Sequence, residues 1–482
     1  MKACFIVASL FLVLSIACTS QKAPEPYGPL PSERQLAWHE MEYYMFVHFT
    51  VNTFTDKEWG YGDEKESVFN PTALDCNQWA EVAKASGMKG IIVTAKHHDG
   101  FCLWPSEFTT HSVKNSPWKD GKGDVLMELK EACQKNGLKL GVYLSPWDRN
   151  SAFYGTPEYL KYYRDQLNEL LTRYGDIFEV WFDGANGGDG YYGGAREIRK
   201  IDRKTYYDWP NTHSIVRTLQ PGAVMFSDAG PDVRWVGNEG GWGSPTNWCL
   251  LRRDEMYPGG DFAKILGEGH EDGNYWVPAE VDVSIRPGWF YHEREDTLVK
   301  TPEKLLDIYY ASVGRNCNLL LNVPPDRRGL LNENDVKALK GFRQLLDSEF
   351  STELGRGMKV KATRSRGKGF DPQRVNDGDK STYWSTPDDV TTASITIDLG
   401  SEKEVNRILV QEFIALGQRI QEYNVEALVG GNWQKLTEGT TIGHKVIKKF
   451  PVVTTSQIRI NILKSKACPC VSEIELYKAP GN

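Results

Sequence analysis

The stretch Asp176-Ile-Phe-Glu-Val-Trp-Phe-Asp-Gly-Ala-Asn-Gly-Gly188 guides the interpretation of the rest of the chain. Its first half is an apolar and aromatic run typical of a buried β-strand. The run stops at Asp183, after which glycines open a loop. In a barrel of parallel strands, chemistry takes place where strands end and loops begin, so the carboxylate of Asp183 is a candidate functional group. Capping of the next turn is the simpler alternative for a strand-end Asp.

Residues 36–354 alternate between strand-like and helix-like segments around this stretch. Apolar strand patterns occur at seven places: residues 41–50, 90–95, 138–145, 176–183, 223–227, 280–285 and 318–323. Amphipathic segments with helix caps occur between them, and the clearest begins at Thr156-Pro157-Glu158. This alternation predicts an α/β fold with a parallel sheet that closes into a (β/α) barrel. No eighth strand is recognisable, so we expect the barrel to be irregular.

The pattern changes near residue 355. Helical periodicity gives way to short alternating segments at residues 394–399, 406–410, 423–429, 458–463 and 473–477, and Gly-rich turns separate them. Such spacing is typical of a β-sandwich. We therefore expect a barrel domain over residues 36–354 and a β-sandwich over residues 355–482.

The N-terminus has the features of an export signal. Lys2 precedes an apolar run at residues 5–16 that is too short for a mature membrane helix. We take residues 1–18 as the leader and the polar, Pro-rich residues 19–35 as a linker. Ala17-Cys18 resembles a bacterial lipoprotein cleavage site, although Ser15 replaces the usual Leu, and ordinary cleavage after Ala17 is the alternative. Either interpretation predicts export to the periplasm of a bacterium, or to its outer membrane if Cys18 is lipidated.

Composition narrows the class of partner. The net charge of −7 gives no reason to expect nucleic-acid binding, because such proteins are usually basic. Aromatic residues make up 12% of the chain, which suits stacking against sugars, although large barrels also bury many aromatic rings. Nine scattered cysteines, two of them in the leader, do not indicate a disulfide framework.

Polar and aromatic clusters follow several of the predicted barrel strands. They are His48, His97-His98-Asp99, Trp147-Asp148 and Asp183, with Glu58-Trp59 and the segment Gly230–Glu239 in nearby loops. The histidines could bind a metal together with Asp99 and Asp183. Neighbouring side chains on a strand point to opposite faces, however, so His97 and His98 do not easily share one ion. Hydrogen bonding to the hydroxyls of a pyranose, with Trp rings nearby, fits these residues better.

Five segments carry a resemblance to a known family: His48–Gly60, Thr94–Phe101, Leu144–Arg149, Val180–Asn186 and Asp232–Glu239. Together they resemble the α-L-fucosidases of glycoside hydrolase family 29. Their form is similar to the subgroup that acts on α-1,3/1,4-linked fucose in branched Lewis-type glycans. The resemblance implies an exo-acting enzyme whose partners are fucosylated oligosaccharides.

The resemblance also implies roles for individual residues. The family is retaining, with Asp183 matching the nucleophile and Glu239 the acid/base, while Glu280 is the rival for the second role. The implied sugar-binding residues are His48, Glu58, Trp59, His97, His98, Trp147, Trp181 and Arg286. No cofactor is implied for catalysis. Two alternatives stay open: a non-catalytic glycan-binding lipoprotein on the same barrel, and a retaining glycosidase of broader specificity.

The C-terminal region resembles a discoidin-like domain of the coagulation factor 5/8 type C family. Residues 375–384 match its early motif and residues 471–477 its last strand. Such domains often bind galactose-type sugars, although a domain that only supports the barrel is an equal alternative. The resemblance implies a structural calcium, for which suitable oxygen ligands are Asp377, Asp379, Thr382 and Glu473.

Overall fold

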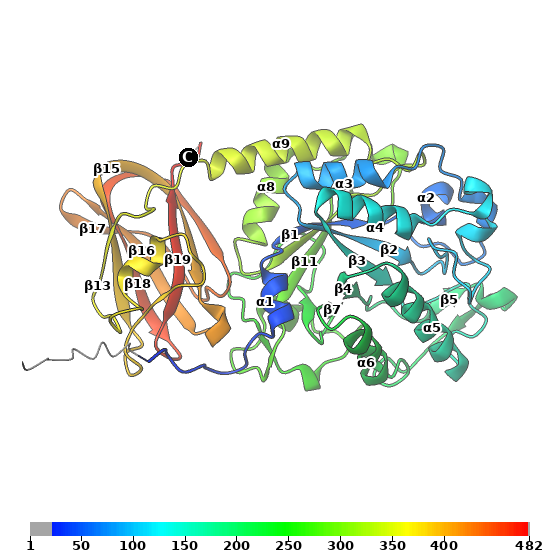
Figure 1. The fold of residues 1–482 in the computed structure, drawn as a ribbon, viewed down its shortest axis with the longest axis horizontal. Helices are drawn as coiled ribbons and strands as arrows, with labels where there is room; N and C mark the ends of the chain where they lie inside the picture. Colours follow the sequence, from blue (N-terminus) through cyan, green and yellow to red (C-terminus); the bar gives the residue numbers. More distant parts are fainter. Residues whose placement is uncertain (1–21, 481–482) are drawn as a thin grey trace, which may run out of the picture.

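The computed structural model describes residues 22–480, which form two domains side by side (Figure 1). The predicted leader and Cys18 lie outside the described residues. The larger domain is a closed barrel of parallel strands surrounded by helices, and the smaller one is an antiparallel β-sandwich. Both predicted folds are confirmed. Among residues 22–480, none of the helices is long and apolar enough to cross a membrane.

The barrel strands follow one another around the barrel in chain order: β1 (Tyr43–Val47), β2 (Gly90–Lys96), β3 (Lys139–Leu144), β4 (Ile177–Trp181), β7 (Val224–Ser227), β8 (Val233–Trp235), β11 (Ala279–Ser284) and β12 (Asn318–Asn322). The strand that the sequence did not reveal is β8. It has three residues and follows β7 after residues 228–232, without the long crossover that parallel neighbours usually need. Three residues are too few to show a strand period.

Helices cover the outside of the barrel (Figure 1). The longer ones are α3 (Cys76–Ala85), α4 (Val125–Asn136), α5 (Pro157–Arg173), α6 (Trp209–Leu219), α8 (Pro302–Ala311) and α9 (Glu333–Glu349). Shorter ones are α1 (Glu33–His39), α2 (Val51–Thr55) and α7 (Ala263–Glu268). The carboxylate of Asp124 accepts from the Met127 N–H at the start of α4, as expected of a cap. Thr156 differs, because its hydroxyl donates to the carbonyl of Phe153 instead of capping α5.

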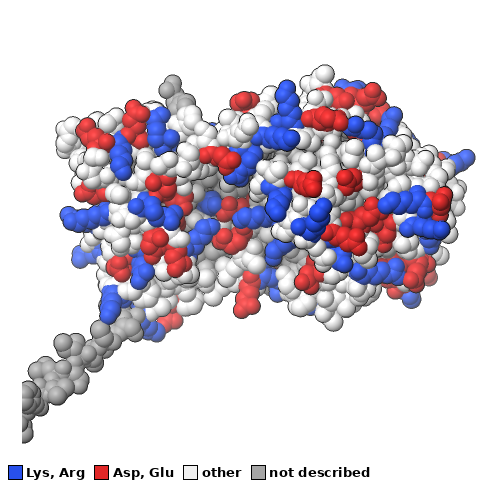
Figure 2. Space-filling model, turned by 45° about the horizontal axis from the view of Figure 1, so that its top comes forward, with Lys and Arg blue, Asp and Glu red and all other residues white. Residues whose placement is uncertain are grey.

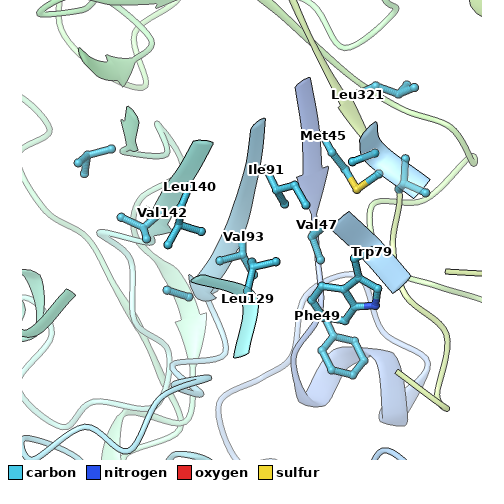
Figure 3. Packing of buried hydrophobic residues seen from close by; sticks show 14 of the residues in the cluster. Met45, Val47, Phe49, Trp79, Ile91, Val93, Leu129, Leu140, Val142 and Leu321 are labelled. Carbon is cyan, nitrogen blue, oxygen red and sulfur yellow. The ribbon is translucent and has the colours of Figure 1, made fainter. Parts of the chain in front are cut away.

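Side-chain alternation along the strands separates an outer core from an interior one. In β1, Met45 and Val47 pack outward against the helices, in the cluster of Figure 3. Tyr44 and Phe46 belong to the interior cluster, together with Tyr143, Trp181 and Phe226. The same alternation takes His48 to the carboxyl end of the interior, two residues after Phe46. It carries Asp183 to that end two residues after Trp181.

Two long strands organise the sandwich, β15 (Ala393–Glu412) and β18 (Val446–Ser465), which pair antiparallel along both halves. Around them lie β13 (Lys359–Ala362), β14 (Trp384–Ser385), β16 (Ile420–Val429), β17 (Asn432–Gly439) and β19 (Cys470–Tyr477). Their apolar faces enclose a core of their own around Trp384 and Ile395. The seven cysteines among the described residues are all free and buried.

Buried ion pairs join the two domains. Arg407 of β15 lies 2.8 Å from Glu349 at the end of α9, and Lys445 contacts Glu42 just before β1. Because Glu42 precedes β1 and Glu349 ends α9, these contacts hold the sandwich against the amino-terminal end of the barrel, away from the strand ends that carry Asp183.

Over the face shown in Figure 2, basic and acidic side chains are intermixed on both domains.

Candidate active site

A cavity of about 380 Å³ opens at the carboxyl ends of the barrel strands. Eight residues singled out from the sequence line it: His48, Glu58, Trp59, His97, His98, Trp181, Asp183 and Glu239. They come from strand ends and loops that are far apart along the chain. The barrel thus converts strand-end positions into one concave polar and aromatic surface, the usual form of a small-molecule site.

The carboxyl group of Asp183 is held in place by two hydrogen bonds. Oδ2 accepts from the Tyr143 hydroxyl at 2.8 Å, and Oδ1 accepts from the Ala185 N–H at 2.7 Å. The side chain keeps 24% of its surface exposed to the cavity. Burial raises the pKa of Asp183, while both hydrogen bonds oppose this shift because they stabilise the ionised form. A positioned carboxylate of this kind can act as a nucleophile.

Glu239 lies in the loop after β8, on the exposed rim of the same cavity. Its Oε2 accepts from the indole N–H of Trp289 at 3.2 Å. Partial burial raises the pKa of Glu239, and the negative charges of Asp183 and Glu58 raise it further. The negative charge of Asp183 in the same cavity therefore biases Glu239 toward its protonated form.

The three histidines of the cavity are neutral, because burial lowers their pKa values: to about 3 for His48 and His98, and well below the ordinary value for His97. Nδ1 of His48 lies 2.8 Å from the Asn322 carboxamide oxygen, which fixes the proton on that nitrogen. Nδ1 of His98 lies 2.7 Å from the Ser145 hydroxyl. Its Nε2 faces Asp183 Oδ2 at 3.8 Å, a spacing at which a ligand hydroxyl can approach both groups.

Glu58 and Trp59 form another side of the cavity. Glu58 accepts hydrogen bonds from the backbone N–H groups of Trp289 and Phe290, and it lies 2.6 Å from Nε2 of His292. Trp59 is 53% exposed, and its ring meets His98 edge-on at 5.2 Å. An exposed, laterally supported indole offers a flat apolar face to a sugar ring.

Trp181 forms the floor. Its ring stacks on Phe226 with centroids 4.0 Å apart and planes 6° apart, and it stacks less closely on Tyr143. Because Tyr143 also donates to Asp183, the floor and the candidate nucleophile belong to one rigid group.

Three predicted residues lie outside the cavity. Trp147 is 3% exposed and lies behind Trp59 and His98, with its indole N–H donating to Tyr192. Arg286 is buried and forms ion pairs with Asp335 and Asp296, so its guanidinium has no direct route to a ligand. Glu280 is buried inside the barrel below Trp181, and it accepts a hydrogen bond from the indole N–H of Trp181.

The cavity contains further residues that sequence reasoning did not select: Phe46, Phe226, Asp228, Trp235, Asp282 and Trp289. Asp228 follows a predicted strand directly, the same signal that identified Asp183, and could have been found. Burial raises its pKa to about 6. Asp282 accepts from the indole N–H of Trp235 at 2.9 Å, and burial raises its pKa well above the ordinary value. Trp289 lies in an irregular loop that carries no such signal.

Metal binding by the cavity histidines is not supported. Among residues 22–480, one set of three side chains brings metal-ligating atoms within 4.8 Å of one another, and it consists of Glu40, Glu42 and His444 at the domain contact. Lys380 and Lys445 already neutralise those two carboxylates. Asp99 is committed to the Thr50 hydroxyl and the Phe101 N–H, and faces no shared ligand position with His97 and His98.

Comparisons with known proteins agree with the geometry. An alpha-L-fucosidase family model matches residues 27–349, and an F5/8 type C domain model matches residues 359–475. Alpha-L-fucosidase 1 of Arabidopsis thaliana is 43% identical over 98% of this chain and 92% of its own length. A glycoside hydrolase 29 family member from an unknown rumen bacterium shares 47% identity with a TM-score of 0.86, covering 95% of this chain and 79% of that chain. A Ruminococcus gnavus fucosidase of that family, solved with fucose, shares 33% identity and a TM-score of 0.86, covering 95% of this chain and 97% of its own.

Proposed function

We propose a substrate class and a mechanism from the premise that this chain belongs to the α-L-fucosidase family, glycoside hydrolase family 29, and is an α-L-fucosidase. The proposed reaction is exo-acting, retaining hydrolysis of α-1,3/1,4-linked L-fucose from branched, Lewis-type glycans. The observation that carries the mechanism is the shared cavity of Asp183, which is firmly hydrogen-bonded, and Glu239, which stands on the rim.

In the first step, Asp183 attacks the anomeric carbon of fucose. A bond forms between its carboxylate oxygen and that carbon while the bond to the departing oxygen breaks, and Glu239 donates its proton to that oxygen. In the second step, Glu239 takes a proton from water, and the water oxygen displaces Asp183. Two inversions at the same carbon release fucose with its original configuration.

The electrostatics of the cavity support these roles. Glu239 must be protonated when substrate binds, and its raised pKa favours that state. Asp183 must be ionised, and the hydrogen bonds from Tyr143 and Ala185 favour that form. Ionisation of Asp183 itself helps to keep the proton on Glu239.

Recognition of the sugar is assigned to the remaining groups of the cavity. The neutral rings of His48, His97 and His98 offer nitrogen atoms to fucose hydroxyls without adding charge near the carbocation-like transition state. Trp59 and Trp181 offer apolar faces, on which the methyl group of fucose can pack. The structure of the Ruminococcus gnavus relative with fucose supports a monosaccharide ligand of this kind.

The specificity is tested by comparing the release of fucose from Lewis a and Lewis x trisaccharides, the unbranched 2′-fucosyl disaccharide and an aryl fucoside. Release from the trisaccharides alone is the expected result. Strong activity on the 2′-linked and aryl compounds would instead indicate the broader specificity. Proton NMR of the sugar first released from the trisaccharide distinguishes retention from inversion, and the β-anomer as first product would contradict the mechanism.

We also propose that the sandwich binds a structural calcium through oxygen atoms of Asp377, Asp379, Thr382 and Glu473. Glu473 is buried, neither of its carboxylate oxygens has a hydrogen-bond partner, and Arg356 lies 3.9 Å from it. The carboxylates of Asp377, Asp379 and Glu473 do not all lie within 4.8 Å of one another, so calcium binding would have to draw them together and displace Arg356. Burial, with Glu475 nearby, raises the pKa of Glu473 to about 8, which a bound cation would reverse. Chelation should therefore lower the Tm and added calcium restore it, and Glu473→Gln should abolish this response. An insensitive Tm in the wild-type protein would contradict the site.

Export and lipid attachment at Cys18 stay proposals that rest on the leader sequence. Expression of the full chain in a bacterium, with Cys18→Ala as the comparison, should show partition of the wild type alone into the detergent phase. Equal partition of both proteins into the aqueous phase would favour ordinary cleavage.

A further inference from the structure

Two carboxyl groups face each other inside the barrel, one layer below the sugar cavity. Glu179 belongs to β4 and Glu280 to β11, and both residues are fully buried. Among residues 22–480, no Lys, Arg or His lies within ion-pair distance of either one. Two ionised carboxylates in a dry interior without a cation are strongly unfavourable, so this pair must hold at least one proton.

Hydrogen bonds show where that proton is needed. Glu280 accepts from the Tyr44 hydroxyl and, at 2.8 Å, from the Trp181 indole N–H. Glu179 accepts from the Trp38 indole N–H through Oε2 at 3.0 Å, but its other oxygen, Oε1, has no donor. A proton on Oε1 that is donated to Glu280 satisfies this orphan atom. With the proton on Glu179, Glu280 is the ionised carboxylate of the pair. An ionised carboxylate is the better acceptor for the two hydrogen bonds that Glu280 receives from Tyr44 and Trp181.

Glu280 reaches the cavity only through Trp181. The ring of Trp181 is clamped from one side by Phe226 at 4.0 Å and contacts Tyr143 on its other side. Tyr143 in turn donates to Asp183. An acceptor below Trp181 therefore fixes the in-plane rotation of the floor, which stacking alone leaves free.

We propose that Glu280 is a positioning residue that anchors Trp181 through a proton shared with Glu179, and thereby holds the floor of the sugar site and the donor to the nucleophile. The inference rests on the proposed function, in which Asp183 is the nucleophile and Glu239 the acid/base. It assigns a role to Glu280 other than that of a rival acid/base, because Glu280 does not line the cavity.

Azide rescue separates the two roles of Glu280. The test uses Glu280→Gln, which keeps an acceptor for Trp181, Glu280→Leu, which removes it, and Glu239→Ala. All are assayed on α-L-fucosyl fluoride, because fluoride leaves without a proton from the acid/base. Glu280→Leu should lower kcat at least about tenfold and raise the Ki of fucose, whereas Glu280→Gln should lose less than about fivefold. Azide should restore turnover of Glu239→Ala and of neither Glu280 variant, because azide replaces a missing acid/base and not a missing anchor.

Azide rescue of a Glu280 variant would overturn the proposal, and so would equal losses in the Gln and Leu variants or a fully active Leu variant. A wild-type protein that releases no fucose from the Lewis trisaccharides would instead count against the proposed function itself. If Glu280→Leu does not fold, two other measurements decide the matter: the Ki of fucose for Glu280→Gln, which should stay within about fivefold of the wild type, and the pH dependence of stability of Glu179→Gln.

The pH dependence of stability tests the shared proton without any activity. The titratable groups that face Glu280 are Tyr44 from β1, Glu179 from β4 and Asp282 from its own strand. Burial raises the pKa of Glu280 to about 7 and that of Glu179 well above its ordinary value. The folded state thus binds more protons than the unfolded state above pH 4.5, and stability is lost as pH rises toward 7 and beyond. In Glu179→Gln the side-chain amide donates the hydrogen bond to Glu280 at every pH, because it has no proton to lose. The Tm of this variant should therefore fall less than that of the wild type between pH 5 and 8. Parallel curves would overturn the shared proton.

Discussion

Tyr143 of β3 donates a hydrogen bond of 2.8 Å to Oδ2 of Asp183, which follows the neighbouring strand β4 by two residues. Tyr143→Phe removes the donor but keeps the ring beside Trp181. The pKa of Asp183, already raised by burial, should rise further, so activity should be lost at a higher pH on the acidic side. A hydrogen bond to a charged group is worth about 1.5–3 kcal/mol, which corresponds to a loss of about 10- to 100-fold in kcat/KM. An unmoved acidic limb in the pH–rate profile would contradict this relationship.

Asp183→Asn should abolish hydrolysis, because a carboxamide cannot form the proposed ester with fucose. The expected loss is at least about a thousandfold in kcat on the Lewis trisaccharide, with little change in Tm. Asp202→Asn, on an exposed turn outside the cavity, is the matched control and should retain full activity. Retention of more than a tenth of the wild-type rate by Asp183→Asn would exclude Asp183 as the nucleophile.

Glu58→Gln should move the alkaline limb of the kcat/KM profile to lower pH. The negative charge of Glu58 is one of the causes that raise the pKa of Glu239, so its removal lowers that pKa and the proton needed for catalysis leaves earlier. The measurement is a pH–rate profile on the Lewis x trisaccharide between pH 4 and 9. A limb that stays in place while KM rises would mean that Glu58 acts only in binding.

Gly184→Ala should impair the enzyme through a steric conflict. A Cβ atom at Gly184 would lie 2.0 Å from Oδ2 of Asp228, so the loop next to the nucleophile would have to shift. We expect kcat to fall about 10- to 100-fold, since small displacements of reacting groups have effects of this size. Gly222→Ala, where nothing lies within 4 Å, is the control and should behave like the wild type.

A second variant, Asp228→Ala, tests whether the Asp228 carboxylate is the source of that steric conflict. If the Asp228 carboxylate causes it, the cost of Gly184→Ala should be much smaller in the Asp228→Ala background than in the wild type. Additive losses in the double variant would place the conflict elsewhere in the loop.

The alternation of strand-like and helix-like segments was sufficient to predict the barrel, and the polar residues at the strand ends were sufficient to predict part of the site. A strand that ends at an acid, repeated at His48 and at His97-His98, places those side chains at one end of a parallel barrel whatever the details of packing. The sandwich could be predicted in the same way from its alternating strands and Gly-rich turns. Residue roles followed from the family resemblance, since local pattern alone does not distinguish a nucleophile from a capping Asp.

Packing between distant segments decided the rest. The three residues of β8 show no period of their own, and they form a strand because β7 and β11 lie on either side of them. Glu280 and Arg286 occur in a segment that borders the site in sequence, yet one is enclosed beneath Trp181 and the other is paired with Asp335. Sequence determines which face of a strand a residue occupies. Only the closed barrel determines its depth along that face, and with it whether a carboxyl group meets the sugar or a buried partner.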